Sequence, residues 1–151
     1  MKKVLLDTSF LLPTVGIDAK REVLRGLESL AHMGVQACFS QFSILELFYA
    51  VKKFKKSGAF DKARFEDGLR SILDGGIYER TEEGSDAFLR ADELRELGHV
   101  DMVDNILYGS SVTNGLKLLT VDQALRSFIR GHGLEDTTVF PSEMDSVLRG
   151  A

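Results

Sequence analysis

The chain has 151 residues and a net charge of −4, with 44% apolar and 28% charged residues. These values are typical of one ordinary globular domain, so we expect residues 1–151 to form a single domain. An internal disulfide is excluded because Cys38 is the only cysteine, and no apolar run reaches the roughly 20 residues that cross a bilayer. The net charge argues against binding nucleic acid by bulk electrostatics. We expect a cytoplasmic protein without membrane contact.

Strands and helices are predicted to alternate along the first half of the chain. Apolar residues at helical spacing (Val23, Leu24, Leu27, Leu30 and Ala31) indicate the buried face of the first helix. The predicted elements are a strand at 3–6 (KVLL), a helix capped by Asp18 and ended by Gly34, a strand at 35–40 (VQACFS), a helix at 41–56 and a helix at 61–73.

The second half continues the same alternation. Its predicted elements are a short strand in GIYERT (76–81), helices at 85–97 and 101–113, a strand in LKLLT (116–120), a helix at 121–129, a strand in TTVF (137–140) and a terminal helix from Pro141. This order is typical of an α/β fold, with a central parallel sheet of about four to five short strands flanked by helices on both faces.

Asp7 is a carboxylate inside an otherwise apolar stretch, LLDTSFLLP at residues 5–13. No helix is predicted directly after it, and its neighbours leave no solvated face. Burial of an unpaired charge is costly, so such a residue normally has a partner, a bound cation or a catalytic role. The alternative is a structural aspartate in a turn.

Four more acids fall where parallel strands end or just beyond. Glu46 lies early in the helix after VQACFS, Asp101 and Asp104 open the helix at 101–113, and Asp122 follows LKLLT. The carboxyl ends of parallel strands share one edge of a sheet, so these carboxylates are expected to lie near Asp7. A set of carboxylates without histidine or cysteine suits Mg²⁺ or Mn²⁺.

Each of these acids also has a purely structural interpretation. Glu46 matches a capping box with Ser43, and Asp122 lies in a second candidate box that begins at Thr120. Asp101 and Asp104 would complement a helix dipole, and for Asp101 we prefer the role of helix cap.

Three segments resemble the PIN-domain nucleases, and the size and layout are similar to those of their VapC-type toxins. They are LLDTS at the first strand, SILELFYAV in the second helix, and DNILYGSSVTNGLKLLTVDQAL, so the resemblance covers Val4 to about Leu125. The spacing of 18 residues between Asp104 and Asp122 (122 − 104) agrees with this family and selects Asp104 over Asp101 as the third acid.

The resemblance implies a metal-dependent endoribonuclease. Asp7, Glu46, Asp104 and Asp122 would be the catalytic metal ligands, with Asp101 as a further candidate, and Ser9 or Thr120 would orient a carboxylate or a water. Asn105 stands where the family more often has a small apolar residue. The implied partners are RNA, a cognate antitoxin whose tail occupies the active-site groove, and a second copy of the chain in a homodimer.

Lys53 and Lys56 are candidate RNA-binding residues on the second helix. Lys53 lies seven residues after Glu46, so the two share nearly one face. The alternative is an ordinary solvated helix end. The leucines and phenylalanines of SILELFYAVKKF are expected in the core or a dimer interface, and His99 is expected to be a polar loop residue rather than a ligand.

Three other functions compete with the toxin hypothesis. A haloacid-dehalogenase-like phosphatase needs a second aspartate two residues after Asp7, and Ser9 occupies that position. A metal-free binding module would have no use for four acids at one edge. A PIN-domain nuclease that acts in RNA processing without an antitoxin is the nearest alternative.

Overall fold

One parallel sheet organises the computed structural model, which describes residues 2–149. Its strand order is β3–β2–β1–β4–β5, and in the central strand Val4 pairs with Ala37 on one side and Lys117 on the other. The predicted α/β class and parallel sheet are therefore confirmed. The strands are β1 (Lys3–Leu6), β2 (Gln36–Phe39), β3 (Glu79–Arg80), β4 (Lys117–Leu119) and β5 (Thr138–Val139).

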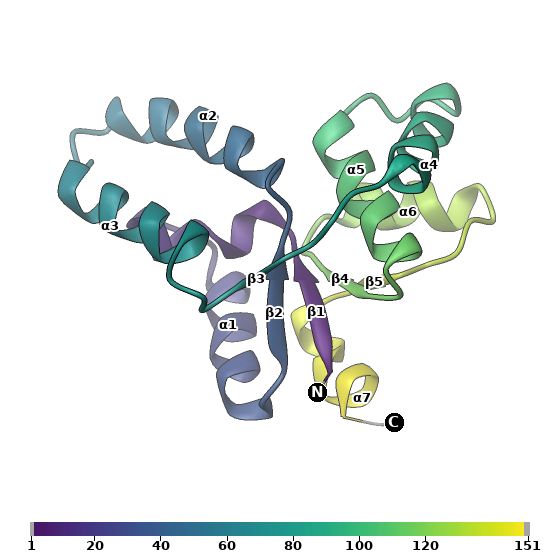
Figure 1. Cartoon of the computed structure of the whole chain (residues 1–151), viewed down its shortest axis with the longest axis horizontal. Coiled ribbons are helices and arrows are strands. Elements are labelled where there is room, and N and C mark those ends of the chain that lie inside the picture. Colours follow the sequence, from purple (N-terminus) through teal and green to yellow (C-terminus); the bar gives the residue numbers. More distant parts are fainter. Residues whose placement is uncertain (1, 150–151) are drawn as a thin grey trace.

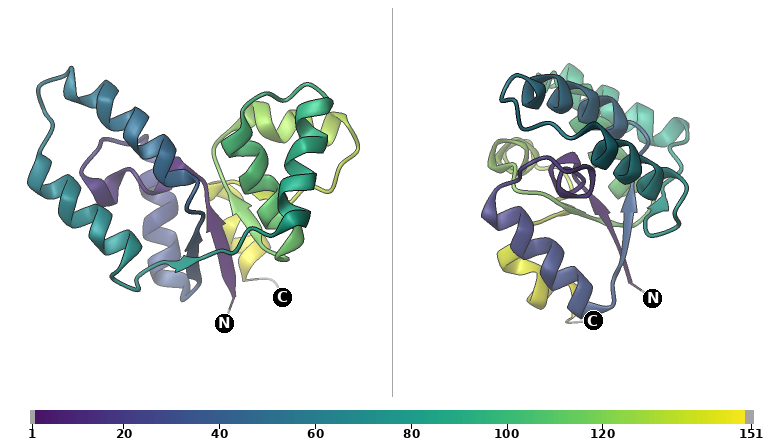
Figure 2. Two further views of the ribbon diagram at one scale, coloured as in Figure 1. Left: turned by 45° about the horizontal axis from the view of Figure 1, so that its top comes forward. Right: turned by 90° about the vertical axis from the view of Figure 1, so that its left-hand side faces the viewer.

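Helices cover both faces of this sheet, as Figures 1 and 2 show. The α-helices are α1 (Arg21–Met33), α2 (Ser43–Lys55), α3 (Lys62–Leu73), α4 (Ser85–Glu96), α5 (Met102–Thr113), α6 (Gln123–Gly131) and α7 (Met144–Leu148). Three short 3₁₀ helices join them: η1 (Thr8–Phe10), η2 (Pro13–Val15) and η3 (Pro141–Glu143). Within residues 2–149, none of the helices combines the length and the apolar character needed to cross a membrane.

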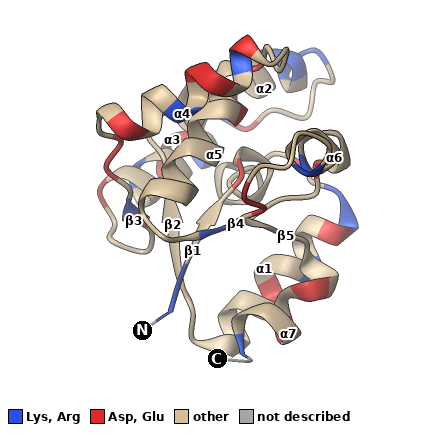
Figure 3. Cartoon of the chain, turned by 90° about the vertical axis from the view of Figure 1, so that its right-hand side faces the viewer, with Lys and Arg blue, Asp and Glu red and all other residues tan. Residues whose placement is uncertain are grey.

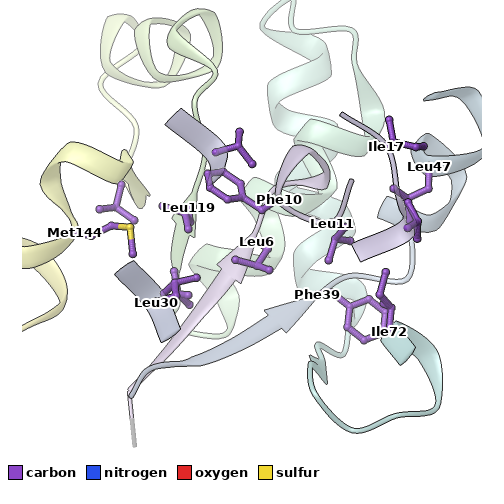
Figure 4. Close-up of a cluster of buried hydrophobic side chains, with 14 of the residues drawn as sticks. Leu6, Phe10, Leu11, Ile17, Leu30, Phe39, Leu47, Ile72, Leu119 and Met144 are labelled. Atoms are coloured by element: carbon purple, nitrogen blue, oxygen red, sulfur yellow. The ribbon is translucent and has the colours of Figure 1, made fainter. Parts of the chain in front are cut away.

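Alternation along β1 divides the core into two clusters. Val4 and Leu6 face the cluster built with α1, α2, α3 and α7, whereas Leu5 faces the cluster built with α4, α5 and α6. Successive side chains of a strand point to opposite faces, so a fully buried strand is apolar throughout. Figure 4 shows the first cluster, where Leu6 and Phe10 lie near Leu119. Because β1 is buried on both of its faces, its end is held firmly in place, and Asp7 directly follows that end.

Three local predictions were wrong. The cap of α1 is Lys20 rather than Asp18, because η2 and the left-handed Gly16 place the chain turn just before it. Leu24 is 48% exposed, since the buried stripe of α1 runs through Val23, Gly26 and Leu30 instead, and Ala31 is exposed as well. A helix does follow Asp7 at once, namely η1, although the Asp7 side chain does not cap it.

Candidate metal centre

Asp7 is held in place by the neighbouring strand end. Its backbone N–H donates to the carbonyl of Leu119 (2.9 Å), and its Oδ2 accepts a hydrogen bond from Thr120 Oγ1 (2.8 Å). Thr120 is fully buried, and its Oγ1 also accepts from the backbone N–H of Asp122 (3.0 Å). One threonine therefore orients Asp7 and links it to the segment that carries Asp122.

Glu46 lies in the first turn of α2 and contacts η1. Thr8 Oγ1 donates to Glu46 Oε1 (2.9 Å), so the carboxylate turns toward the end of β1. The capping box with Ser43 does not form, because Ser43 Oγ is buried without a hydrogen-bond partner. Sequence reasoning missed Thr8, and the only available signal was its place next to Asp7 in the DTS triplet.

The N-terminus of α5 brings two more acids to Glu46. Asp101 is the helix cap, since its Oδ1 accepts from the backbone N–H of Asp104 (3.2 Å). Carboxylate oxygens of Glu46, Asp101 and Asp104 also lie within 4.8 Å of one another. Asp101 thus combines the role of helix cap with a place in the acidic cluster.

Asp122 caps α6 in the same way. Its Oδ1 accepts from the backbone N–H of Leu125 (3.0 Å), which leaves Oδ2 for another partner. The structural interpretation as a helix cap is therefore correct for Asp101. Asp122 is itself the cap of α6, so the helix does not begin with the expected capping box at Thr120, and the box expected for Glu46 does not form either. A cap uses one carboxylate oxygen, so capping and metal binding are compatible in one side chain.

The electrostatics of the cluster are unfavourable without a cation. Burial, followed by the charges of Asp7, Asp101, Glu46 and Asp122, raises the pKa of Asp104 to about 8. Burial is likewise the largest cause that raises the pKa values of Asp7 and Glu46, although hydrogen bonds from Thr120 and Thr8 oppose it. Lysines gather elsewhere, at the C-terminal end of α2 (Figure 3).

The donor set fits a small divalent cation. The five acids at this edge of the sheet are Asp7, Glu46, Asp101, Asp104 and Asp122. None of the ion pairs formed within residues 2–149 involves any of them, so the described part of the chain offers these acids no basic partner. Carboxylate oxygens are the ligands that Mg²⁺ and Mn²⁺ prefer. Ser9 Oγ is a further buried oxygen, one residue past Thr8 and without a hydrogen-bond partner.

The remaining predicted residues lie outside the cluster. Lys53 and Lys56 are exposed beyond Glu46 on α2 and at its C-terminal end. Asn105 is fully buried, and its amide bonds to His99 rather than to a carboxylate. His99 is thus more than a polar loop residue. On α2, Leu45 is 54% exposed and Tyr49 is 76% exposed, so these two side chains are not part of the core.

Comparison with known proteins gives one family and several structures. A family model described as the PIN domain matches residues 4–130. A toxin–antitoxin complex from Klebsiella pneumoniae is 18% identical, with a TM-score of 0.58 over 91% of this chain and 97% of that chain.

Two structures described as VapBC are similarly close in fold. VapBC2 from Rickettsia felis, bound to a promoter DNA fragment, is 17% identical, with a TM-score of 0.57 over 90% of this chain and 98% of that one. DNA-bound VapBC from Salmonella typhimurium is 21% identical, with a TM-score of 0.54 over 91% and 99%. Comparison with curated proteins found no match.

Proposed function

Since the chain belongs to the PIN domain family, whose model covers residues 4–130, we propose that it is a metal-dependent endoribonuclease and the toxin of a toxin–antitoxin pair. The observation that carries the proposal is the acidic cluster itself. Glu46, Asp101 and Asp104 converge from two helices on opposite faces of the sheet. Glu46 and Asp104 are partly buried beside the exposed Asp101, and bringing such like charges together is costly unless a cation joins them. A divalent cation resolves this conflict.

The residues of the site divide into ligands and supports. We assign Glu46, Asp104 and Asp101 to the cation, with Asp7 and Asp122 beside them on the strand ends, where their charges reach Asp104. Thr120 and Thr8 hold the carboxylates of Asp7 and Glu46 in fixed orientations. When bound, Mg²⁺ or Mn²⁺ supplies the positive charge that lowers the pKa of water and stabilises charge on a phosphodiester under attack.

Cleavage of total cellular RNA by the purified protein tests the proposal directly. We expect cutting with Mg²⁺ or Mn²⁺, none with EDTA, and loss of cutting in Asp104→Asn. Asp86→Asn is the matched control, because Asp86 is an exposed acid on α4 outside the cluster. If folded wild-type protein with bound Mn²⁺ cuts no RNA, the nuclease assignment fails and the alternative of a binding module on a PIN fold gains support.

Lys53 and Lys56 are the proposed contacts to the RNA backbone. Each phosphate that a lysine neutralises steepens the salt dependence of single-strand binding by about 0.7. Replacement of both residues by glutamine should therefore lower the slope of log affinity against log salt by about 1.4. Lys117→Gln is the control, because Lys117 is exposed at the amino end of β4, away from the acids. An unchanged slope removes the two lysines from the RNA surface.

We also propose a protein antitoxin and a homodimer as partners. A structure described as a toxin–antitoxin complex shares the fold. Two exposed apolar side chains on α2, Leu45 and Tyr49, also lie within one turn of Glu46. A peptide that covers this side of α2 would block access to the acids. The molar mass from light scattering tests the homodimer. Inhibition of RNA cleavage by the co-expressed antitoxin tests the toxin–antitoxin pair. An active nuclease for which no inhibitory protein partner is found would favour the alternative role in RNA processing. The free, buried Cys38 agrees with action in a reducing cytoplasm.

A further inference from the structure

Asn105 is a buried polar residue that serves none of the roles assigned so far. It is 0% exposed, it follows Asp104 directly, and both ends of its side-chain amide bond to His99. Its Oδ1 lies 2.7 Å from His99 Nδ1, and its Nδ2 donates to the backbone carbonyl of His99, also at 2.7 Å. Burial of an amide is favourable only when such bonds are made, so the position is specifically adapted to this contact.

The chemistry of the contact admits one arrangement. A backbone carbonyl only accepts, so the amide nitrogen of Asn105 must face it and Oδ1 must face the ring. Because Oδ1 also only accepts, His99 Nδ1 must carry the proton. The ring is further held by an edge contact with Phe128 of α6, at 5.1 Å between centroids. His99 is thus fixed by both its backbone and its ring.

His99 belongs to the turn that delivers Asp101 to the acidic cluster. The turn joins α4 to α5, and it contains Gly98 at a φ of +113°. Its other side chains are exposed, with Val100 at 82%. The turn therefore has little apolar packing of its own, and Asn105 connects it to the buried body of α5.

We propose that Asn105 is a positioning residue that holds this turn so that the Asp101 carboxylate stays within reach of Glu46 and Asp104. The inference rests on the proposed metal site and concerns how that site is preorganised. Outer-shell residues that orient ligands typically contribute 10- to 100-fold to metal affinity. Asn105 acts through Asp101, so its effect on affinity should disappear when the Asp101 carboxylate is absent.

A double-mutant cycle with Mn²⁺ as the ligand tests this. Titration calorimetry well below the melting temperature gives the Mn²⁺ Kd of the wild type, Asp101→Asn, Asn105→Leu and the double variant. We expect Asn105→Leu to weaken Mn²⁺ binding by about tenfold in the wild-type background and to have no further effect beside Asp101→Asn. His99→Leu keeps the backbone bond to Asn105 and should give a smaller loss; it also serves if Asn105→Leu fails to fold.

Ser111→Ala is the matched control for stability. Ser111 is also fully buried on α5, and it bonds to Thr137 Oγ1 at 2.6 Å, away from the turn. It should lower the melting temperature and leave the Mn²⁺ Kd unchanged. Equal Kd values for the wild type, Asn105→Leu and His99→Leu, or full additivity with Asp101→Asn, would overturn the positioning role alone. A wild type that does not bind Mn²⁺ would overturn the metal site as well.

Discussion

Replacement of Asp104 by asparagine should stabilise the metal-free protein at neutral and alkaline pH. Its pKa rises from the ordinary 3.8 to about 8 in the fold, chiefly because the group is buried and secondarily because four acids surround it. Between these values the folded chain retains a proton that the unfolded chain releases. Stability must therefore fall as the pH rises from about 4 to about 8.

The magnitude follows from this difference in pKa. Each pH unit within the window costs 1.36 kcal/mol, so the ceiling at pH 8 is about 6 kcal/mol. Entry of water and relaxation of the surrounding side chains reduce the cost, and we expect a gain of about 2 kcal/mol for Asp104→Asn at pH 8. At pH 4 the folded wild type carries a protonated, neutral Asp104 and the variant carries a neutral amide, so the gain in stability from the substitution should be close to zero.

Urea denaturation in EDTA at pH 4, 6 and 8 measures the effect. Asp136→Asn is the control with the opposite sign: burial alone would raise the pKa of Asp136, but hydrogen bonds from Thr138 and Arg130 outweigh burial and lower it. That variant should lose stability above about pH 4, where the unfolded carboxylate is ionised. Saturating Mn²⁺ should stabilise the wild type much more than Asp104→Asn.

One result would refute this reasoning. If Asp104→Asn lowers the free energy of unfolding at pH 8 in EDTA by more than about 1 kcal/mol, the carboxylate must have a favourable partner in the metal-free fold. The side chain would then be structural, and its assignment as a metal ligand would be wrong.

Three further changes probe the support of the site and the fold. Thr120→Val should cost about 1–2 kcal/mol of stability and weaken Mn²⁺ binding in calorimetry, because Asp7 Oδ2 loses its donor at 2.8 Å; an unchanged Mn²⁺ Kd would separate Asp7 from the metal. Arg126→Met should cost about 2–4 kcal/mol in urea denaturation, because it removes the hydrogen bonds of the buried Arg126 to Thr138 together with its ion pair to the partly exposed Glu143; a loss below 1 kcal/mol would show that these contacts are replaceable. Gly109→Ala should lower the melting temperature by several degrees, because a Cβ there would lie 2.3 Å from the Ala87 carbonyl; wild-type stability would mean that α4 and α5 separate easily.

Much of the architecture could be predicted because hydrophobic periodicity and the alternation of strands and helices along the chain are local signals. Alternating strands and helices indicated the parallel sheet, and an acid directly after a buried strand indicated the strand end near which the acids gather. The role of Glu46 was harder, since the spacing from Ser43 suits a capping box and equally suits a helix face turned toward the site. A tertiary contact with Thr8 decides between them, and no local pattern contains it.

Supporting residues were the least predictable part of the site. Ser9 and Thr120 were equal candidates from the sequence, yet only the Thr120 hydroxyl reaches a carboxylate. The choice depends on the register of β4 beside β1, where Leu6 pairs with Leu119 and so places the next residue beside Asp7. Asn105 was similarly ambiguous, because its partner His99 comes within reach only after α4 packs against α5.

The five acids differ in how firmly the fold holds them in position. This difference is the reason that Asp101 in particular needs a supporting residue. Asp7 follows a strand that is buried on both faces, and Thr120 fixes its orientation. Asp101 lies instead at the end of an exposed turn, where local opening of the backbone needs the least free energy. A cation site with ideal geometry cannot tolerate one ligand that moves much more than the others. In our proposal the buried amide at position 105 meets this requirement where the turn has little apolar packing, whereas a small apolar residue there would leave the turn held mainly by its own backbone hydrogen bonds.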